Sequence, residues 1–97
     1  MGFFLTTRHA ELMTEVIESF GEEHQLIKAI EEMSELQKEL CKYLEGDHSD
    51  ARVCNISEEM ADLEILLAQM YFIFDNTGSV QSWRTEKLRR LEERVAR

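Results

Sequence analysis

The chain has 97 residues, of which 43% are hydrophobic and 32% are charged, a composition typical of one globular domain rather than of a disordered segment. Its 20 acidic and 11 basic residues give a net charge of −9, which argues against a general binder of nucleic-acid polymers, because such proteins present basic surfaces. No apolar run approaches the ~20 residues that a membrane span needs. We therefore expect one cytoplasmic domain, residues 1–97, with neither membrane nor nucleic-acid polymer as a partner.

A hydrophobic period of 3.6 residues predicts four helices, and no segment alternates with the period of a strand. In chain order, the helices are expected at about residues 7–20, 22–44, 55–74 and 79–96. Gly21 separates the first two helices, and turn-forming residues at 46–50 follow the second. Asn55 is the expected N-cap of the third helix, with Glu58 completing a capping box, and Ser79 is the expected cap of the fourth. The predicted fold is an all-α four-helix bundle.

The charges are distributed unevenly along the chain. Residues 1–82 contain 17 acids and 5 bases, whereas residues 83–97 contain 6 bases and 3 acids. An acidic body followed by a basic last helix fits charge pairing within the molecule, and it also fits a metal-bridged anionic ligand. If phosphate is bound, the candidates are the basic side chains of the last helix, since no glycine-rich phosphate loop is present. These candidates are Arg84, Lys87, Arg90 and Arg94.

Two pairs of acids have the spacing that places both members on one helix face. Glu32 and Glu35 are three residues apart in the second helix, and Glu59 and Asp62 are three apart in the third. On a helical wheel, Glu59 and Asp62 fall inside the apolar arc of their helix. Because unpaired buried carboxylates are costly, the sequence implies that something cationic meets them there.

The four acids converge if the second and third helices pack antiparallel. A site of carboxylates alone suits a hard cation, namely magnesium, manganese or calcium. The alternatives to a metal site are that the acids lie on solvated helix faces or form salt bridges within the molecule. No Glu-x-x-His motif accompanies the acids, which argues against a di-iron bundle, and Cys41 and Cys54 lack metal-ligand spacing, so we expect reduced thiols.

The order of these motifs is similar to that of the MazG-like family of all-α nucleoside triphosphate pyrophosphohydrolases. Glu-Glu-Met-Ser-Glu-Leu at 31–36 and Ser-Glu-Glu-Met-Ala-Asp-Leu at 57–63 resemble the family's two acidic motifs, with 23 residues between Glu35 and Glu59. The apolar segments at 65–67 and 72–74 and the closing Glu-Lys-Leu-Arg-Arg-Leu at 86–91 look most like short single-domain members found in phages and prophages.

The resemblance implies magnesium-dependent hydrolysis of a nucleoside triphosphate between its α and β phosphates, with manganese as a possible substitute. By this resemblance Glu32, Glu35, Glu59 and Asp62 are the metal ligands, and Lys87 is the lysine that contacts phosphate. Glu35 is our candidate for activating the water, and Arg90 and Arg94 are further candidate substrate contacts. Longer relatives place an asparagine four residues after the lysine, where this chain has Leu91.

The third helix is hydrophobic over most of its circumference, which predicts a homodimer or homotetramer, because a short four-helix chain cannot cover it and also leave a nucleotide cleft. The alternative function is a non-catalytic acidic helical module for interaction or regulation, with a degenerate nucleotide site. The intact set of four acids favours the enzyme.

Overall fold

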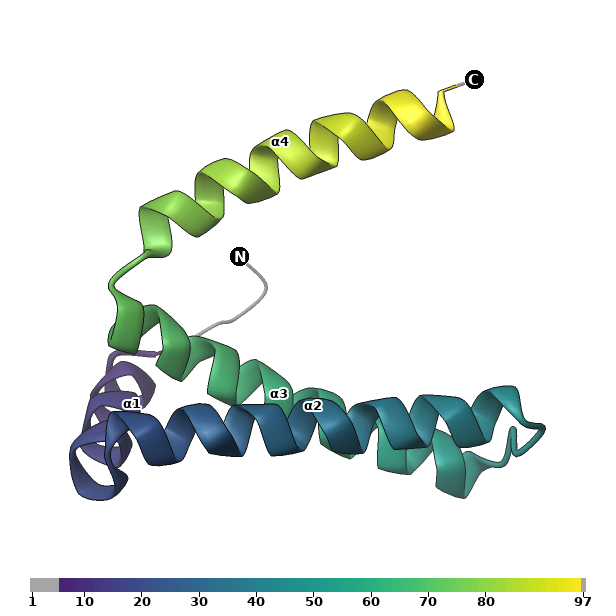
Figure 1. The fold of residues 1–97 in the computed structure, drawn as a ribbon, viewed down its shortest axis with the longest axis horizontal. Coiled ribbons are helices and arrows are strands. Elements are labelled where there is room, and N and C mark those ends of the chain that lie inside the picture. The colour runs from purple at the N-terminus through teal and green to yellow at the C-terminus, as the bar shows by residue number, and fades with distance from the viewer. Residues whose placement is uncertain (1–5, 97) are drawn as a thin grey trace.

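The computed structural model describes residues 6–96 and contains four helices and no strand in that range (Figure 1). The helices are α1 (Thr7–Phe20), α2 (Glu22–Leu44), α3 (Asp50–Phe74) and α4 (Thr77–Val95). The predicted all-α class is therefore confirmed. None of the helices in the described range is long and apolar enough to cross a membrane.

The first two helices have the predicted boundaries. Thr6 caps α1, since its hydroxyl oxygen accepts a 3.1 Å hydrogen bond from the backbone amide of His9. Gly21 ends α1 and precedes α2 with a φ of 92°, a region that glycine enters without the steric penalty of a side chain. The chain therefore changes direction at a single residue between the two helices.

The third helix begins at Asp50, so the prediction of a start near Asn55 was wrong. The side-chain oxygen of Ser49 accepts a 3.1 Å hydrogen bond from the backbone amide of Arg52, and Asp50 adds an acid to the first turn. Asn55 and Glu58 lie inside the helix and do not form its N-terminus. No glycine or proline interrupts residues 50–54, so the earlier cap starts the helix.

The fourth helix begins at Thr77, with Asn76 rather than Ser79 in the N-cap position. The Asn76 side chain makes no capping hydrogen bond. The connection from α3 consists only of Asp75 and Asn76, and Asp75 has a left-handed backbone with a φ of 47°. The connection is thus two residues shorter than the interval 75–78 that separates the predicted third and fourth helices.

Three helices form the body of the molecule, and the fourth projects from it. α2 and α3 pack along each other, α1 packs on both, and α4 leads away without comparably extensive contact (Figure 1). The buried hydrophobic residues of the described range are Met13, Ala29, Leu66 and Ala68. A single chain therefore has a small core, and the predicted four-helix bundle is not closed within it.

Candidate metal centre

Two polar contacts hold α2 and α3 antiparallel. Near the start of α2, Nε2 of Gln25 donates a buried 2.8 Å hydrogen bond to Oε1 of Gln69, near the end of α3. Near the end of α2, the half-buried carboxylate of Glu39 accepts a hydrogen bond from the guanidinium of Arg52 in the first turn of α3. The two helices are thus linked by their side chains at both ends of the shared interface.

The acids lie between these two contacts. Glu32 is seven residues, about two helical turns, from both Gln25 and Glu39, and so lies on the same face of α2. On α3, Asp62 is seven residues before Gln69. Antiparallel packing in this register therefore places Glu32 opposite the Glu59–Asp62 segment.

Three of the four predicted metal ligands come together. One carboxylate oxygen from each of Glu32, Glu59 and Asp62 lies within 4.8 Å of the others, and all three residues are half-buried. Burial of these side chains agrees with the helical-wheel expectation for Glu59 and Asp62. The three acids come from two helices, so their proximity depends on the packing of α2 against α3 and not on local sequence alone.

Glu35 does not belong to this group of three oxygens. Its side chain is 49% exposed and forms a 3.4 Å ion pair with Lys38, one turn further along α2. Its negative charge nevertheless contributes to the raised pKa of Glu59, so it acts on the cluster from its edge. Glu35 is therefore available as a group beside the cluster rather than within it.

The electrostatics of the cluster disfavour full ionisation. The pKa of Glu59 is raised to about 7, first because its protonated form shares a hydrogen bond with Glu32, and then by burial and by neighbouring acidic charges. Burial, followed by the charge of Glu32, raises the pKa of Asp62. Oε2 of Glu59 is buried and has no hydrogen-bond donor in the described part of the chain. A proton or a cation at this point would relieve the repulsion.

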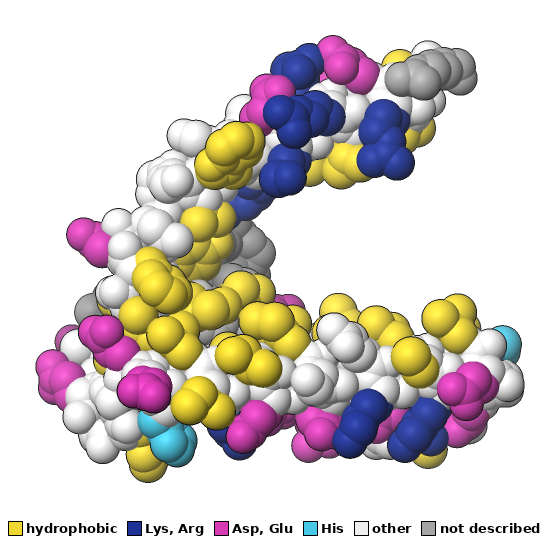
Figure 2. All heavy atoms as spheres, viewed as in Figure 1, with side chains coloured by type: hydrophobic (Ala, Val, Ile, Leu, Met, Phe, Trp, Pro, Cys, Tyr) yellow, Lys and Arg dark blue, Asp and Glu magenta, His cyan; other side chains and the backbone are white. Residues whose placement is uncertain are grey.

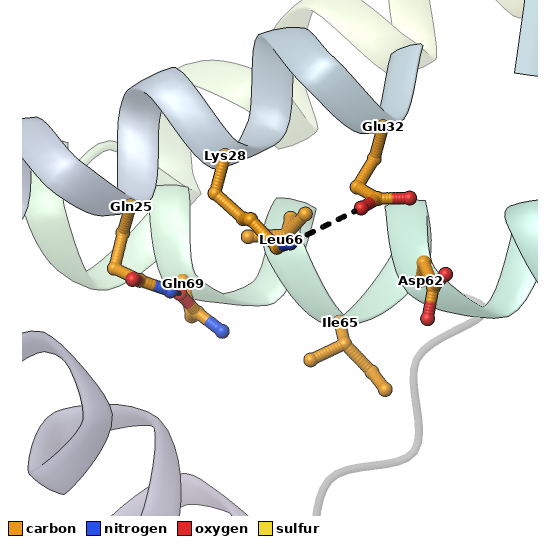
Figure 3. Close-up of a pocket in the computed structure, with 7 residues that line it drawn as sticks. All are labelled: Gln25, Lys28, Glu32, Asp62, Ile65, Leu66 and Gln69. Carbon is orange, nitrogen blue, oxygen red and sulfur yellow. Dashed lines mark hydrogen bonds and ion pairs between the residues drawn. The ribbon is translucent and has the colours of Figure 1, made fainter. Parts of the chain in front are cut away.

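A pocket of about 270 Å³ opens beside two of the acids (Figure 3). Its lining residues are Gln25, Lys28, Glu32, Asp62, Ile65, Leu66 and Gln69. Lys28 is the one cation among them, and its Nζ forms a 3.5 Å ion pair with Glu32. The pocket therefore combines acids, one ammonium group, an amide pair and an apolar wall.

The sequence analysis did not identify Gln25, Lys28 or Gln69 as part of the site. The signal was present in their spacing, because Lys28 lies four residues before Glu32, and each glutamine lies seven residues from an acid on its own helix. Each amide is thus a polar residue on an otherwise apolar packing face. Such residues can be assigned to the site only when the packing of the two helices is known.

The predicted phosphate contacts lie elsewhere. Lys87, Arg90 and Arg94, together with Leu91, line a cavity of about 370 Å³ on α4 that shares no lining residue with the acidic pocket. Arg90 forms a 3.2 Å ion pair with Glu86. Within residues 6–96, Lys87 and Arg94 have no ion-pair partner. The structure of one chain therefore brings three acids together but keeps the basic candidates apart from them.

Comparisons with known proteins identify no relative: no protein-family model, curated protein or solved structure matches the chain. The likeness to the MazG-like family accordingly depends on the two acidic motifs, their order and their spacing. Membership of that family stays a prediction.

Proposed function

We propose that this protein is a magnesium-dependent pyrophosphohydrolase that converts a ribo- or deoxynucleoside triphosphate to a nucleoside monophosphate and pyrophosphate. The observation that carries the proposal is the convergence of three carboxylate oxygens within 4.8 Å from two helices. Internal salt bridges are the alternative to a bound cation as the source of positive charge for these acids. Lys28 forms such an ion pair with Glu32, but Glu59 and Asp62 have no ion-pair partner among residues 6–96. An acidic cluster without such partners is the feature that a bound cation explains.

The donor set suits magnesium, with manganese as a substitute, because it consists of carboxylates without histidine or thiolate. Glu32, Glu59 and Asp62 are the residues that would hold the cation, and the buried Oε2 of Glu59 is the atom most in need of it. When bound, the cation would polarise the α-phosphoryl group, activate water and offset the charge of the leaving pyrophosphate.

The remaining residues supply the other parts of the reaction. Glu35 is assigned as the general base, because it is exposed and lies beside the three clustered acids rather than among them. The water oxygen forms a bond to the α-phosphorus, the bond to the bridging oxygen breaks, and the water proton passes to Glu35. Lys28 offers one positive charge in the pocket to a phosphate oxygen.

The proposal is tested by incubating the purified protein with magnesium and a panel of ribo- and deoxynucleoside triphosphates, while both products are identified. Pyrophosphate and monophosphate in equal amounts, abolished by chelator, are expected. Glu59→Gln and Asp62→Asn should each lower turnover at least about 100-fold, whereas Glu64→Gln, which neutralises an exposed acid of the same helix outside the cluster, should retain it.

Three outcomes would contradict the proposal. Release of a diphosphate and orthophosphate would mean that a different bond is cleaved. Metal binding without turnover of any triphosphate would exclude this substrate class and direct attention to modified or phosphoribosyl nucleotides. The absence of both binding and turnover would favour the non-catalytic acidic module.

A further inference from the structure

The pocket beside the acids has two chemically different ends (Figure 3). Glu32 and Asp62 lie at one end, the amide pair Gln25–Gln69 lies at the other, and Lys28 lies between them on α2. On each helix the two ends are seven residues apart, which is about 10 Å along the helix axis. This separation is comparable to the length of a nucleoside monophosphate from its phosphate to the far edge of its base.

A chain of hydrogen bonds fixes the orientation of the Gln69 amide. Nδ1 of His24 and Oε1 of Gln25 are 2.7 Å apart, so a protonated Nδ1 donates to this oxygen. The other polar atom of the Gln25 amide, Nε2, donates the 2.8 Å hydrogen bond to Oε1 of Gln69. The ring of His24 stacks on that of Phe20, with the two centroids 5.6 Å apart. The polar atom left at the end of this chain is Nε2 of Gln69.

Nε2 of Gln69 is a hydrogen-bond donor at the edge of the pocket, and it points away from Gln25 into the pocket (Figure 3). Gln69 is only 4% exposed, and this nitrogen has no acceptor among residues 6–96. Two carboxylates and one ammonium group line the pocket, and their net negative charge favours the positive end of the amide dipole on that side. Because an unpaired buried donor is costly, a ligand atom that accepts its hydrogen bond would be favoured there.

The wall of the pocket between its two ends is apolar. Ile65 and Leu66 both line it, and Ile65 is 50% exposed. An apolar wall with a few convergent polar groups is typical of small-molecule sites, and the volume of about 270 Å³ is close to the lower end of their ~300–1,000 Å³ range. The wall suits the face of a planar ring, and the amide suits the edge of that ring.

We propose that Gln69 determines base specificity, with its Nε2 donating a hydrogen bond to a carbonyl oxygen on the edge of the nucleobase. His24 and Gln25 are positioning residues that hold the amide in this orientation. The inference rests on the proposed function, because a cation and the α-phosphate at the acids direct the base towards the amide end. An amino group at the same edge would place two donors face to face and leave the amide without an acceptor.

The substrate class follows from this contact. The favoured bases carry a carbonyl at the ring position where cytosine and adenine carry an amino group, so they are uracil, thymine, hypoxanthine and guanine. The contact is made with the base, and it therefore applies to ribo- and deoxynucleotides alike.

Matched pairs of substrates test the assignment, since the two members differ in hydrogen bonding at the base edge and hardly in size. The value of kcat/KM is measured with magnesium for dUTP against dCTP and for dITP against dATP. We expect the carbonyl-bearing member of each pair to be favoured about 10–100-fold. A ratio below about threefold in either pair, or a preference for the amino-bearing member, would overturn the proposal.

Two variants show whether the preference comes from the amide. Gln25→Leu/Gln69→Leu removes the donor and its partner together, so the ratio in each pair should fall to within about threefold. Lys28→Gln is the control, because it removes a charge from the same pocket without changing the amide pair. It should lower kcat/KM for all four substrates by a similar factor and keep the ratios. A wild-type ratio that persists in a folded Gln25→Leu/Gln69→Leu protein would overturn the proposal.

A second measurement uses the wild-type protein and requires no turnover. Selective ¹⁵N labelling of the glutamine side chains gives four amide signals, and those of Gln37 and Gln81, outside this pocket, serve as references. With magnesium present, dUMP should shift the Gln69 signal and should bind at least about tenfold more tightly than dCMP by calorimetry. A Gln69 signal that stays in place at saturating dUMP would show that the amide makes no contact with the base.

The measurements distinguish failure of this inference from failure of the proposed function. Hydrolysis of triphosphates with equal kcat/KM within each pair would overturn the role of Gln69 and leave the pyrophosphohydrolase intact. Preferential binding of dUMP with a shifted Gln69 signal, but without hydrolysis of any triphosphate, would support the role of Gln69 and contradict the proposed function.

Discussion

The side-chain amide of Gln25 on α2 donates a buried 2.8 Å hydrogen bond to the side-chain oxygen of Gln69 on α3, two helical turns from the acids Glu32 and Asp62. Because both glutamines also line the pocket beside these acids, the contact links the packing of the helices to the geometry of the site. If one helix slid along the other, the hydrogen bond would break, and the same movement would carry the acids apart. A polar contact in an apolar interface thereby specifies a single register.

Gln69→Leu should destabilise the protein by about 1–3 kcal/mol, because the buried amide of Gln25 loses its acceptor. For a chain of this size, each kcal/mol corresponds to a fall in Tm of about 4–8 °C, measurable by circular dichroism. Gln25→Leu/Gln69→Leu removes both partners and should recover most of the lost stability. A double variant that is as unstable as the sum of the two single variants would contradict this account of the pair.

The folded protein should become more stable as the pH falls from 8 towards 5 in metal-free buffer with chelator. The pKa of Glu59 is about 7 in the folded state, above its ordinary value of 4.5, so the folded state binds a proton that the unfolded chain does not bind in that interval. The stabilisation is complete below about pH 4.5 and is lost as the pH rises through 7. The raised pKa of Asp62 acts in the same direction.

Glu59→Gln provides the test of this assignment, because the amide resembles the protonated acid. Its Tm at pH 8 should exceed that of the wild type, and the rise in Tm on acidification should be smaller. Glu64→Gln, at an exposed position further along the same helix, serves as the control and should follow the wild-type profile. An unchanged pH profile in Glu59→Gln would show that another group titrates.

Magnesium should bind more weakly in acid. Since the carboxylate of Glu59 must be ionised to serve as a ligand, the cation displaces a proton below about pH 7. The apparent affinity should decrease by up to about tenfold for each pH unit below 7, as measured by calorimetry. Heats recorded in two buffers of different ionisation enthalpy should reveal the released proton. Constant affinity between pH 5 and pH 8 would exclude Glu59 as a ligand.

Substitutions of Glu35 and of Asp62 should have different effects on metal affinity and on turnover. Asp62→Asn replaces one of the three clustered carboxylates by a neutral amide and should weaken metal binding as well as turnover. Glu35→Gln leaves the cluster intact, so it should retain metal affinity within about threefold while kcat falls about 10²–10⁴-fold, the usual contribution of a general base. Equal losses of metal affinity in the two variants would instead make Glu35 a fourth ligand.

Most of the helical structure could be predicted from the sequence, because hydrophobic periodicity and turn residues are local signals. The start of α3 was misplaced, since Ser49 and Asn55 are both good N-caps, and only the additional contacts of Arg52 with Asp47 and Glu39 show which one is used. Glu59 and Asp62 were identifiable because acids are unusual on an apolar helix face. Lys28 and the two glutamines could not be identified as site residues, because nothing in their own helices distinguishes them before the packing of α2 against α3 is known.

The amino-acid sequence by itself determined the helices, the excess of acid in the body, the basic character of the last helix and the helix faces on which the acids lie. All of these features depend only on residue type and on the period of a single helix. Tertiary structure decided which carboxylates meet: Glu32 joins Glu59 and Asp62, while Glu35 stays with Lys38 at the edge. It also decided that Lys87 lies apart from the acids of its own chain. Contacts between helices depend on their register and on the direction of short connections, and neither quantity is carried by the periodicity of a single segment.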